Sequence, residues 1–188
     1  MTRHGSLRCT LLLIVAATLG ACATVPDDAS VVEKLDDETG LTVARLGRPI
    51  EVYRETFLKE PSGRFAFMGP FETNQMGTRE LFVWVAVPIE LGEQDASPIV
   101  TVNGKELALG TPGRTPDFAG LLKSPYKIPT PWSSMYYYRV DSSLIGALGE
   151  ARTISVRVTE PTRDGTVKTV FAVTLEANDA RLRDFAAR

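Results

Sequence analysis

Histidine and cysteine are almost absent from this 188-residue chain, which contains one histidine, His4, and two cysteines, Cys9 and Cys22. All three lie within the first 22 residues. If residues 1–21 are removed, for which the sequence gives reasons below, 167 residues remain and keep only Cys22. Such a chain has no Ser-His-Asp or Cys-His catalytic set, no histidine or cysteine zinc site and no internal disulfide.

An excess of positive charge is also missing. The chain has 21 Lys and Arg against 23 Asp and Glu, a net charge of −2, which becomes −4 when Arg3 and Arg8 leave with residues 1–21. Binding of nucleic acid or of anionic lipid through bulk charge needs a basic surface, so the net charge argues against both, and we expect no nucleic-acid partner. In other respects the composition, with 44% hydrophobic and 23% charged residues, is ordinary for a globular protein.

Long apolar runs are absent except at the N-terminus. Residues 11–19 are apolar apart from one threonine, with Arg3 and Arg8 before them and the small residues Gly20 and Ala21 after them. This three-part pattern is typical of a secretory signal peptide. The run is too short to span a bilayer, which needs about 20 residues.

The end of this signal, Leu19-Gly20-Ala21-Cys22, resembles the lipobox of bacterial lipoproteins. In that family the cysteine sulfur receives a diacylglycerol, a dedicated peptidase cuts before the cysteine, and the new amine is acylated. The resemblance implies cleavage between Ala21 and Cys22, lipidation of Cys22, and a membrane as partner. Several acyl chains, at about 0.8 kcal/mol per buried CH₂, anchor a protein stably. An ordinary cleaved signal with an incidental Cys22, or an uncleaved anchor, are the alternatives.

The residue after the cysteine, Ala23, bears on location. By resemblance to Gram-negative lipoproteins, an alanine here rather than an aspartate favours the outer membrane, so we expect a lipid-anchored cell-envelope protein that faces the periplasm. Beyond the lipobox, the domain resembles small uncharacterised envelope lipoproteins of proteobacteria. That resemblance implies no particular activity.

Residues 22–40 predict a lipidated acidic tether. Residues 23–40 hold six carboxylates and one lysine, a composition that favours a solvated linker. The spacing of a calcium-binding loop is absent. Val31, Val32 and Leu35 would allow one short helical turn within the tether.

From residue 41 onward, short apolar segments alternate with Gly- and Pro-rich turns. This pattern predicts a single all-β domain over residues 41–188, an immunoglobulin-like antiparallel β-sandwich. We expect a short crossover helix over 141–149 and a short helix over 178–188. The expected strands span 41–46, 49–58, 64–72, 79–87, 98–102, 105–109, 135–140, 152–160 and 166–175.

Two turns fix strand register. Asn103-Gly104 is a strong hairpin signal, because both residue types tolerate positive φ. Asp164-Gly165 predicts a second hairpin, in which a one-residue slip would move every apolar side chain to the other face. Its predicted pairs are Val158 with Phe171, Val156 with Val173, and Ile154 with Leu175.

The sequence offers few candidate catalytic side chains. Glu51 and Glu55 share a strand face and could form a paired-carboxylate site, although solvent-facing charge explains them equally well. Ser124 and Lys127 match the S-x-x-K spacing, but prolines follow both and the partner motifs are missing. We therefore predict no catalytic residue, no metal site and no cofactor.

The segment 123–139 is unusually rich in aromatic and proline residues. Aromatic side chains on an extended loop are suited to stacking on sugar rings or to holding a protein partner. Lys123, Lys127 and Arg139 would add contacts to anionic glycan or lipid headgroups. The alternative is that the aromatics fill the core, with at most one or two of the consecutive tyrosines pointing inward. The candidate ligand or partner surface consists of Tyr126, Trp132, Tyr136, Tyr137 and Tyr138.

These observations predict a non-enzymatic binding or scaffolding module at the cell envelope, with an envelope protein or a glycan as its further partner. A structural lipoprotein subunit of a secretion or pilus assembly is the first alternative. A glycan-binding module or a carboxylate-based glycosidase is the second.

Overall fold

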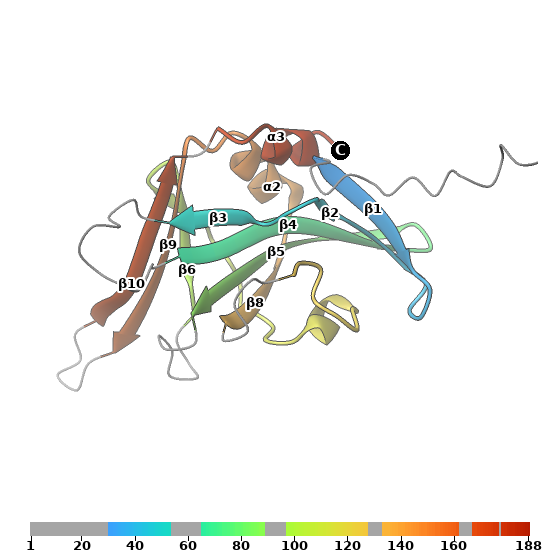
Figure 1. Ribbon diagram of the computed structural model, residues 1–188, viewed down its shortest axis with the longest axis horizontal. Coiled ribbons are helices and arrows are strands. Elements are labelled where there is room, and N and C mark those ends of the chain that lie inside the picture. Colours follow the sequence, from blue (N-terminus) through green and yellow to red (C-terminus); the bar gives the residue numbers. More distant parts are fainter. Residues whose placement is uncertain (1–29, 54–64, 89–96, 128–132, 162–166, 177) are drawn as a thin grey trace, which may run out of the picture.

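Two antiparallel sheets form the framework of the protein (Figure 1). The computed structural model describes residues 30–53, 65–88, 97–127, 133–161, 167–176 and 178–188. The larger sheet has six strands in the order β1-β2-β4-β5-β8, with β3 also paired to β4, and the smaller has the order β10-β9-β6-β7. The predicted all-β sandwich with short helices is therefore confirmed.

The larger sheet contains β1 (Val31–Asp36), β2 (Leu41–Leu46), β3 (Ile50–Tyr53), β4 (Phe65–Gln75), β5 (Thr78–Pro88) and β8 (Ser133–Val140). The smaller sheet contains β6 (Ile99–Val102), β7 (Lys105–Glu106), β9 (Thr153–Pro161) and β10 (Val167–Glu176). A 3₁₀ helix, η2 (Pro116–Ala119), lies in the long β7–β8 connection, and the α-helices are α2 (Ser142–Gly149) and α3 (Ala180–Ala186). The strand expected over 105–109 is shorter in the structure, because β7 stops at Glu106. Of the strand expected over 49–58, β3 covers 50–53, and residues 54–58 lie outside the described residues.

Both predicted hairpin registers are confirmed. Val158 pairs with Phe171, Val156 with Val173, and Ile154 with Leu175, while the turn itself lies outside the described residues. Asn103 and Gly104 adopt φ of 50° and 79° and join β6 to β7. Local turn chemistry and alternation along the strand thus determine which side chains of the smaller sheet enter the core.

An aspartate caps the N-terminus of each α-helix. The carboxylate of Asp141 accepts a hydrogen bond from the Leu144 amide at 2.9 Å, and that of Asp179 accepts one from the Arg181 amide at 2.9 Å. The two helices lie together over one face of the larger sheet, beside the smaller sheet (Figure 1). Leu182 and Phe185 of α3 are buried there, as expected.

The predicted tether is wrong over residues 31–40. Residues 31–36 form β1, which pairs with β2 along its whole length, from Val31 opposite Leu46 to Asp36 opposite Leu41. The same register excludes the short helical turn. β1 lies at the border of the sheet, where charged side chains remain in water, so an acidic composition is compatible with a strand. The folded domain therefore begins at residue 31, nine residues after Cys22.

Both faces of the larger sheet are covered. Residues 82–86 of β5 are fully buried, because β5 is a central strand with neighbours on both sides. On one face, Tyr138 of β8 reaches the smaller sheet and donates a hydrogen bond to the Pro98 carbonyl at 3.0 Å. On the other face, the β7–β8 connection packs on the sheet, with the rings of Phe118 and Phe82 6.4 Å apart. This second cover forms the candidate site.

Candidate functional site

The proposed aromatic surface is wrong for all four of its tyrosines that the structure describes. Tyr126, Tyr136, Tyr137 and Tyr138 are each at most 2% exposed. Successive tyrosines of β8 point to opposite faces of the larger sheet, and both faces are covered, so all three are buried. Trp132, the fifth residue of the surface, lies outside the described residues.

Tyr126 has a structural role instead. Its ring lies over Gly69 of β4 and packs against Trp84, with ring centroids 5.2 Å apart. Its hydroxyl donates to the Pro70 carbonyl and accepts from the Leu46 amide, the latter at 3.2 Å. Burial raises the pKa of this phenol well above its usual value. Tyr126 thus attaches the β7–β8 connection to two strands of the larger sheet.

Arg45 of β2 is held beside this tyrosine. Its Nη1 donates hydrogen bonds of 2.8 Å to the carbonyls of Leu46 and Gly47, and its guanidinium carbon lies 5.6 Å from the centre of the Tyr126 ring. A half-buried guanidinium with these contacts is positioned before any ligand arrives.

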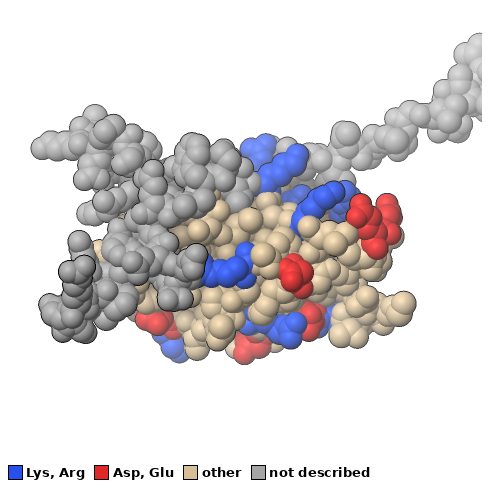
Figure 2. All heavy atoms as spheres, turned by 90° about the horizontal axis from the view of Figure 1, so that it is seen from below, with Lys and Arg blue, Asp and Glu red and all other residues tan. Residues whose placement is uncertain are grey.

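A groove of about 600 Å³ runs between the β1–β2 hairpin and residues 121–127. We call it the basic groove, because five cationic side chains line it: Lys34, Arg45, Arg48, Lys123 and Lys127. Its carboxylates all lie at the end of β1 and in the turn that follows, residues 36–38. Figure 2 views the molecule from this side, where Lys and Arg side chains gather along one edge next to a cluster of carboxylates.

The basic groove continues into a second hollow of about 500 Å³, which shares Arg48, Pro49 and Lys127 with it. Arg181 of α3 also lines this hollow and contacts Asp179, with 2.6 Å between Nη2 and Oδ2. The hydrogen bonds from Arg181 hold the pKa of Asp179 below its usual range. This carboxylate is therefore ionised at neutral pH and offsets the charge of Arg181 locally.

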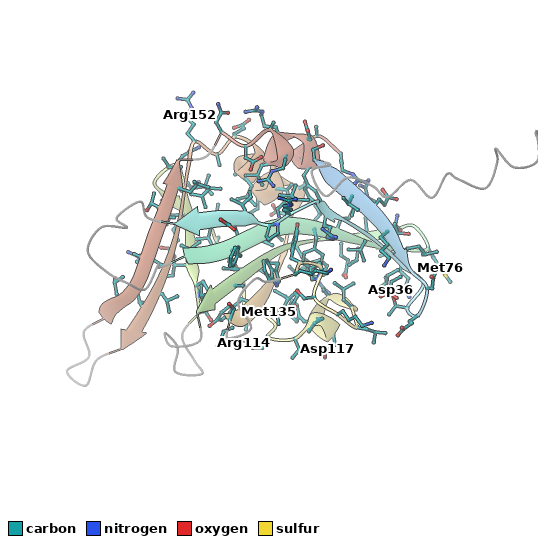
Figure 3. All side chains as sticks on the ribbon, viewed as in Figure 1. Asp36, Met76, Arg114, Asp117, Met135 and Arg152 are labelled. Carbon is teal, nitrogen blue, oxygen red and sulfur yellow. The ribbon has the colours of Figure 1, made fainter. Side chains whose placement is uncertain are left out.

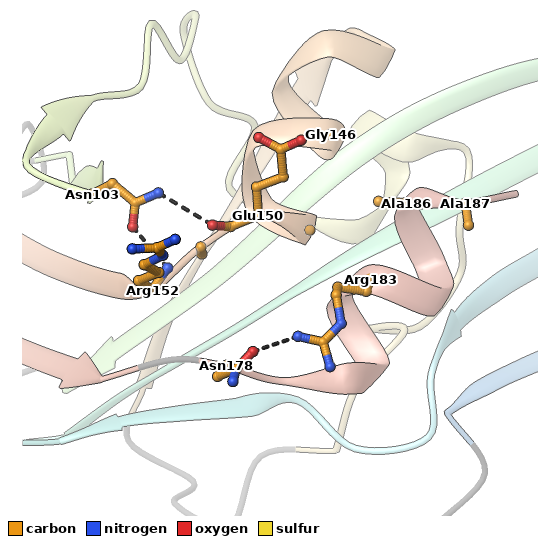
Figure 4. Close-up of a pocket in the computed structure, with 10 residues that line it drawn as sticks. Asn103, Gly146, Glu150, Arg152, Asn178, Arg183, Ala186 and Ala187 are labelled. Carbon is orange, nitrogen blue, oxygen red and sulfur yellow. Dashed lines mark hydrogen bonds between the residues drawn. The ribbon is translucent and has the colours of Figure 1, made fainter.

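A third hollow, of about 850 Å³, lies where α2 and α3 meet the β6–β7 hairpin (Figure 4). Glycine and alanine supply half of its lining. Asn103 uses its side chain within the fold, since its Oδ1 accepts from the Arg152 and Thr153 amides at 2.7 and 3.1 Å. Arg183 likewise donates to the side chain of Asn178. The bonds of Asn103 attach the β6–β7 hairpin to the start of β9, and the bond of Arg183 connects α3 with the residues that precede it.

The remaining candidate residues are not brought together. Glu51 is exposed on β3, while Glu55 lies outside the described residues. Ser124 and Lys127 belong to a non-helical segment, so they are not one helical turn apart. Among the residues that the structure describes, no three His, Cys, Asp or Glu side chains are grouped closely enough to hold a metal. Within the same residues, every helix is too short or too polar to cross a membrane.

Comparison with protein-family models, with curated proteins and with solved structures finds no match for this chain.

The tyrosine attachment predicts a contrast between two neighbouring substitutions. Tyr126→Phe removes hydrogen bonds to Leu46 and Pro70 inside the protein, so we expect the free energy of unfolding to fall by about 2 kcal/mol. Ser124→Ala removes a buried hydroxyl that lies beside Tyr137 but makes no hydrogen bond of good geometry to a described residue, so the loss should be smaller, below about 1 kcal/mol. Urea unfolding of both variants measures the contrast, and equal losses would contradict the assignment.

Proposed function

We propose that this chain is a lipid-anchored protein of the cell envelope, and that its sandwich domain is a non-enzymatic binding module. The observation that carries the proposal is the sequence Leu19-Gly20-Ala21-Cys22 together with its position, nine residues before the first strand. The outer membrane, on its periplasmic side, is the location that Ala23 favours.

The short distance between Cys22 and β1 supports attachment close to a bilayer. Nine residues extend to at most about 30 Å, and as a flexible chain they span roughly 17 Å. A lipid on Cys22 would therefore hold the start of β1 near the headgroups. A domain held in this way meets partners at the membrane surface rather than in bulk solution.

The basic groove supports binding rather than catalysis. Its cations surround an open hollow, and Arg45 is fixed by two backbone carbonyls. Ser124 belongs to the lining of the groove, but its hydroxyl oxygen is buried on the side of Tyr137, and no activating base contacts it among the residues that the structure describes. The glycan-binding alternative depended on exposed aromatic side chains, and the burial of the four tyrosines removes most of its basis.

Mass spectrometry of the protein purified from membranes tests the proposal. We expect the N-terminal peptide to begin at Cys22 and to carry a diacylglyceryl group and an acylated amine. Cys22→Ser should leave residues 1–21 attached, because the peptidase of this family acts on the lipidated cysteine. Cys9→Ser, within the segment to be removed, is the matched control and should be processed normally. An uncut peptide that spans positions 15–30 without fatty acid would overturn the proposal.

A further inference from the structure

We propose that the basic groove docks on anionic lipid headgroups of the bilayer that holds the anchor, so that the domain lies against the membrane in one orientation. This inference rests on the proposed lipidation of Cys22, and its test is arranged so that the two can fail separately.

Three of the five cations of the groove, Arg45, Arg48 and Lys127, lie toward one of its ends, whereas Lys34 lies on β1 two residues from Asp36. Arg48 and Lys127 line both the groove and the hollow that continues it, and Arg45 is bonded to the neighbouring Leu46 and Gly47 carbonyls. At the other end, the carboxylates of residues 36–38 occupy the last position of β1 and the turn that follows. Figure 3 places Asp36 beside Met76, at the tip of the sheet.

The register of β1 on β2 gives the distance between these ends. Val31 pairs with Leu46 at the cationic end, and Asp36 pairs with Leu41 at the anionic end. Five residue steps along a strand cover about 17 Å. Exposed charges interact over about 8–10 Å at physiological salt, so a surface that meets the cationic end is largely screened from the carboxylates.

The anchor enters the domain at the cationic end. β1 begins at Val31, opposite Leu46, and Gly47, Arg48 and Pro49, which follow, line the groove. The nine residue steps from Cys22 to Val31 reach at most about 30 Å. An acylated Cys22 therefore brings a bilayer within reach of Arg45, Arg48 and Lys127, whereas the carboxylate turn points to the far end of the strand.

The electrostatic attraction of each cation to the membrane is weak, but several such attractions are enough to orient a domain that is already anchored. One Lys or Arg near an anionic membrane favours association about fivefold. Once the anchor is inserted, docking becomes an intramolecular step at high effective concentration, so three cations can set the orientation without providing the attachment. Arginine suits phosphate particularly well, because its planar guanidinium offers several N–H donors.

A fluorescent label on the lipidated full-length protein tests this orientation. Leu122 is 57% exposed and lies between two groove-lining residues, Leu121 and Lys123, so Leu122→Cys reports on the groove. Lys105→Cys on β7, in the smaller sheet, is the distant control. Because the thiol of Cys22 is blocked when it is lipidated, the introduced cysteine is the single free thiol after processing.

The labelled proteins are reconstituted into vesicles that carry a lipid-bound quencher. In phosphatidylcholine vesicles with about one third phosphatidylglycerol, we expect strong quenching at position 122 and weak quenching at position 105. The difference should disappear in pure phosphatidylcholine and at 1 M salt, where the screening length falls to about 3 Å. Equal quenching at the two positions under all conditions would overturn the proposal.

Charge reversal supplies the second test. Arg48→Glu with Lys127→Glu should lower the ratio of docked to undocked protein at least 25-fold, the product of two fivefold factors. Lys105→Glu with Arg152→Glu changes the net charge equally at distant exposed positions, and quenching at position 122 should then persist. Loss of quenching in both pairs would point to net charge alone and reject a specific docking face.

The starting material separates the two proposals. Mass spectrometry before labelling reports whether Cys22 is acylated, and unmodified protein would reject the anchor. If acylated protein floats with vesicles of both compositions but shows no preference for position 122, the anchor stands and the docking face is rejected. If the groove binds nucleic acid or an acidic protein but position 122 is not quenched in anionic vesicles, the proposal of lipid docking is also rejected.

Discussion

Gly69→Ala is expected to lower the free energy of unfolding by about 3 kcal/mol. A Cβ at this position would lie 2.6 Å from Cζ of Tyr126, well inside van der Waals contact. The ring cannot withdraw freely, because its hydroxyl is bonded to Pro70 and Leu46. Overpacking in a core costs about 1–3 kcal/mol, and each hydrogen bond that breaks as the ring moves costs about 1 kcal/mol more.

Denaturant unfolding measures this loss, with Gly110→Ala as the matched control. No atom lies within 4 Å of a Cβ built at Gly110, so its substitution should change stability by less than about 0.5 kcal/mol. Combining Gly69→Ala with Tyr126→Ala removes the clash, so the double variant should lose less stability than the sum of the losses in the two single variants. An unchanged unfolding midpoint for Gly69→Ala would show that the ring does not occupy this position.

The second large effect is expected at alkaline pH. Burial raises the pKa of Tyr126, Tyr137 and Tyr138 above the value of about 10 that tyrosine has in an unfolded chain. Above pH 10 the unfolded state therefore loses phenolic protons that the folded state keeps. Stability is fully present below pH 10 and is lost as the pH rises, by about 1.4 kcal/mol per pH unit for each buried phenol.

Urea unfolding at several pH values from 8 to 11.5, with tyrosinate absorbance recorded in parallel, tests this expectation. The three phenols should ionise together with unfolding, as one cooperative step. Tyr126→Phe removes one of them, so the slope of stability against pH above 10 should fall by about one third. Independent titration of all tyrosines near pH 10 in a protein that stays folded would contradict the burial described here.

Local patterns in the sequence predict the hairpins of the smaller sheet. Asn103-Gly104 and the alternating residues of β9 and β10 determine register over distances of a few residues. The capping aspartates of α2 and α3 act over the same range. Such features depend on neighbours in the chain, which is why they can be predicted without knowing what packs on the sheet.

The burial of the β8 tyrosines depends on segments that are distant in the sequence. Alternation predicts one inward and one solvated face, but Tyr137 lies under the β7–β8 connection while Tyr136 and Tyr138 point to the opposite, equally covered face. One sequence signal indicated this burial. β5 is apolar on both faces, which predicts that both faces of the sheet are covered, and β8 pairs directly with β5.

The basic groove could not be predicted from local patterns. Lys123 and Lys127 were singled out, but Arg45 and Arg48 lie about 75 residues earlier in the chain. Nothing in either segment indicates the other, and the link between them is the bond from Leu46 to the hydroxyl of Tyr126. The acidic composition of residues 31–38 also prevented the prediction of β1. A strand at the border of a sheet can keep most of its side chains partly in contact with water, so it need not have a strongly apolar sequence.

The two borders of the larger sheet have a consequence for self-association. Glu33, Lys34 and Asp36 place both signs of charge along β1, which disfavours the addition of a strand from another molecule. At the opposite border, Gly113 exchanges two backbone hydrogen bonds of 2.9 Å with Tyr137 and occupies part of β8. Under the proposed lipidation, many copies would be crowded into two dimensions, and these borders would oppose the growth of continuous intermolecular sheets.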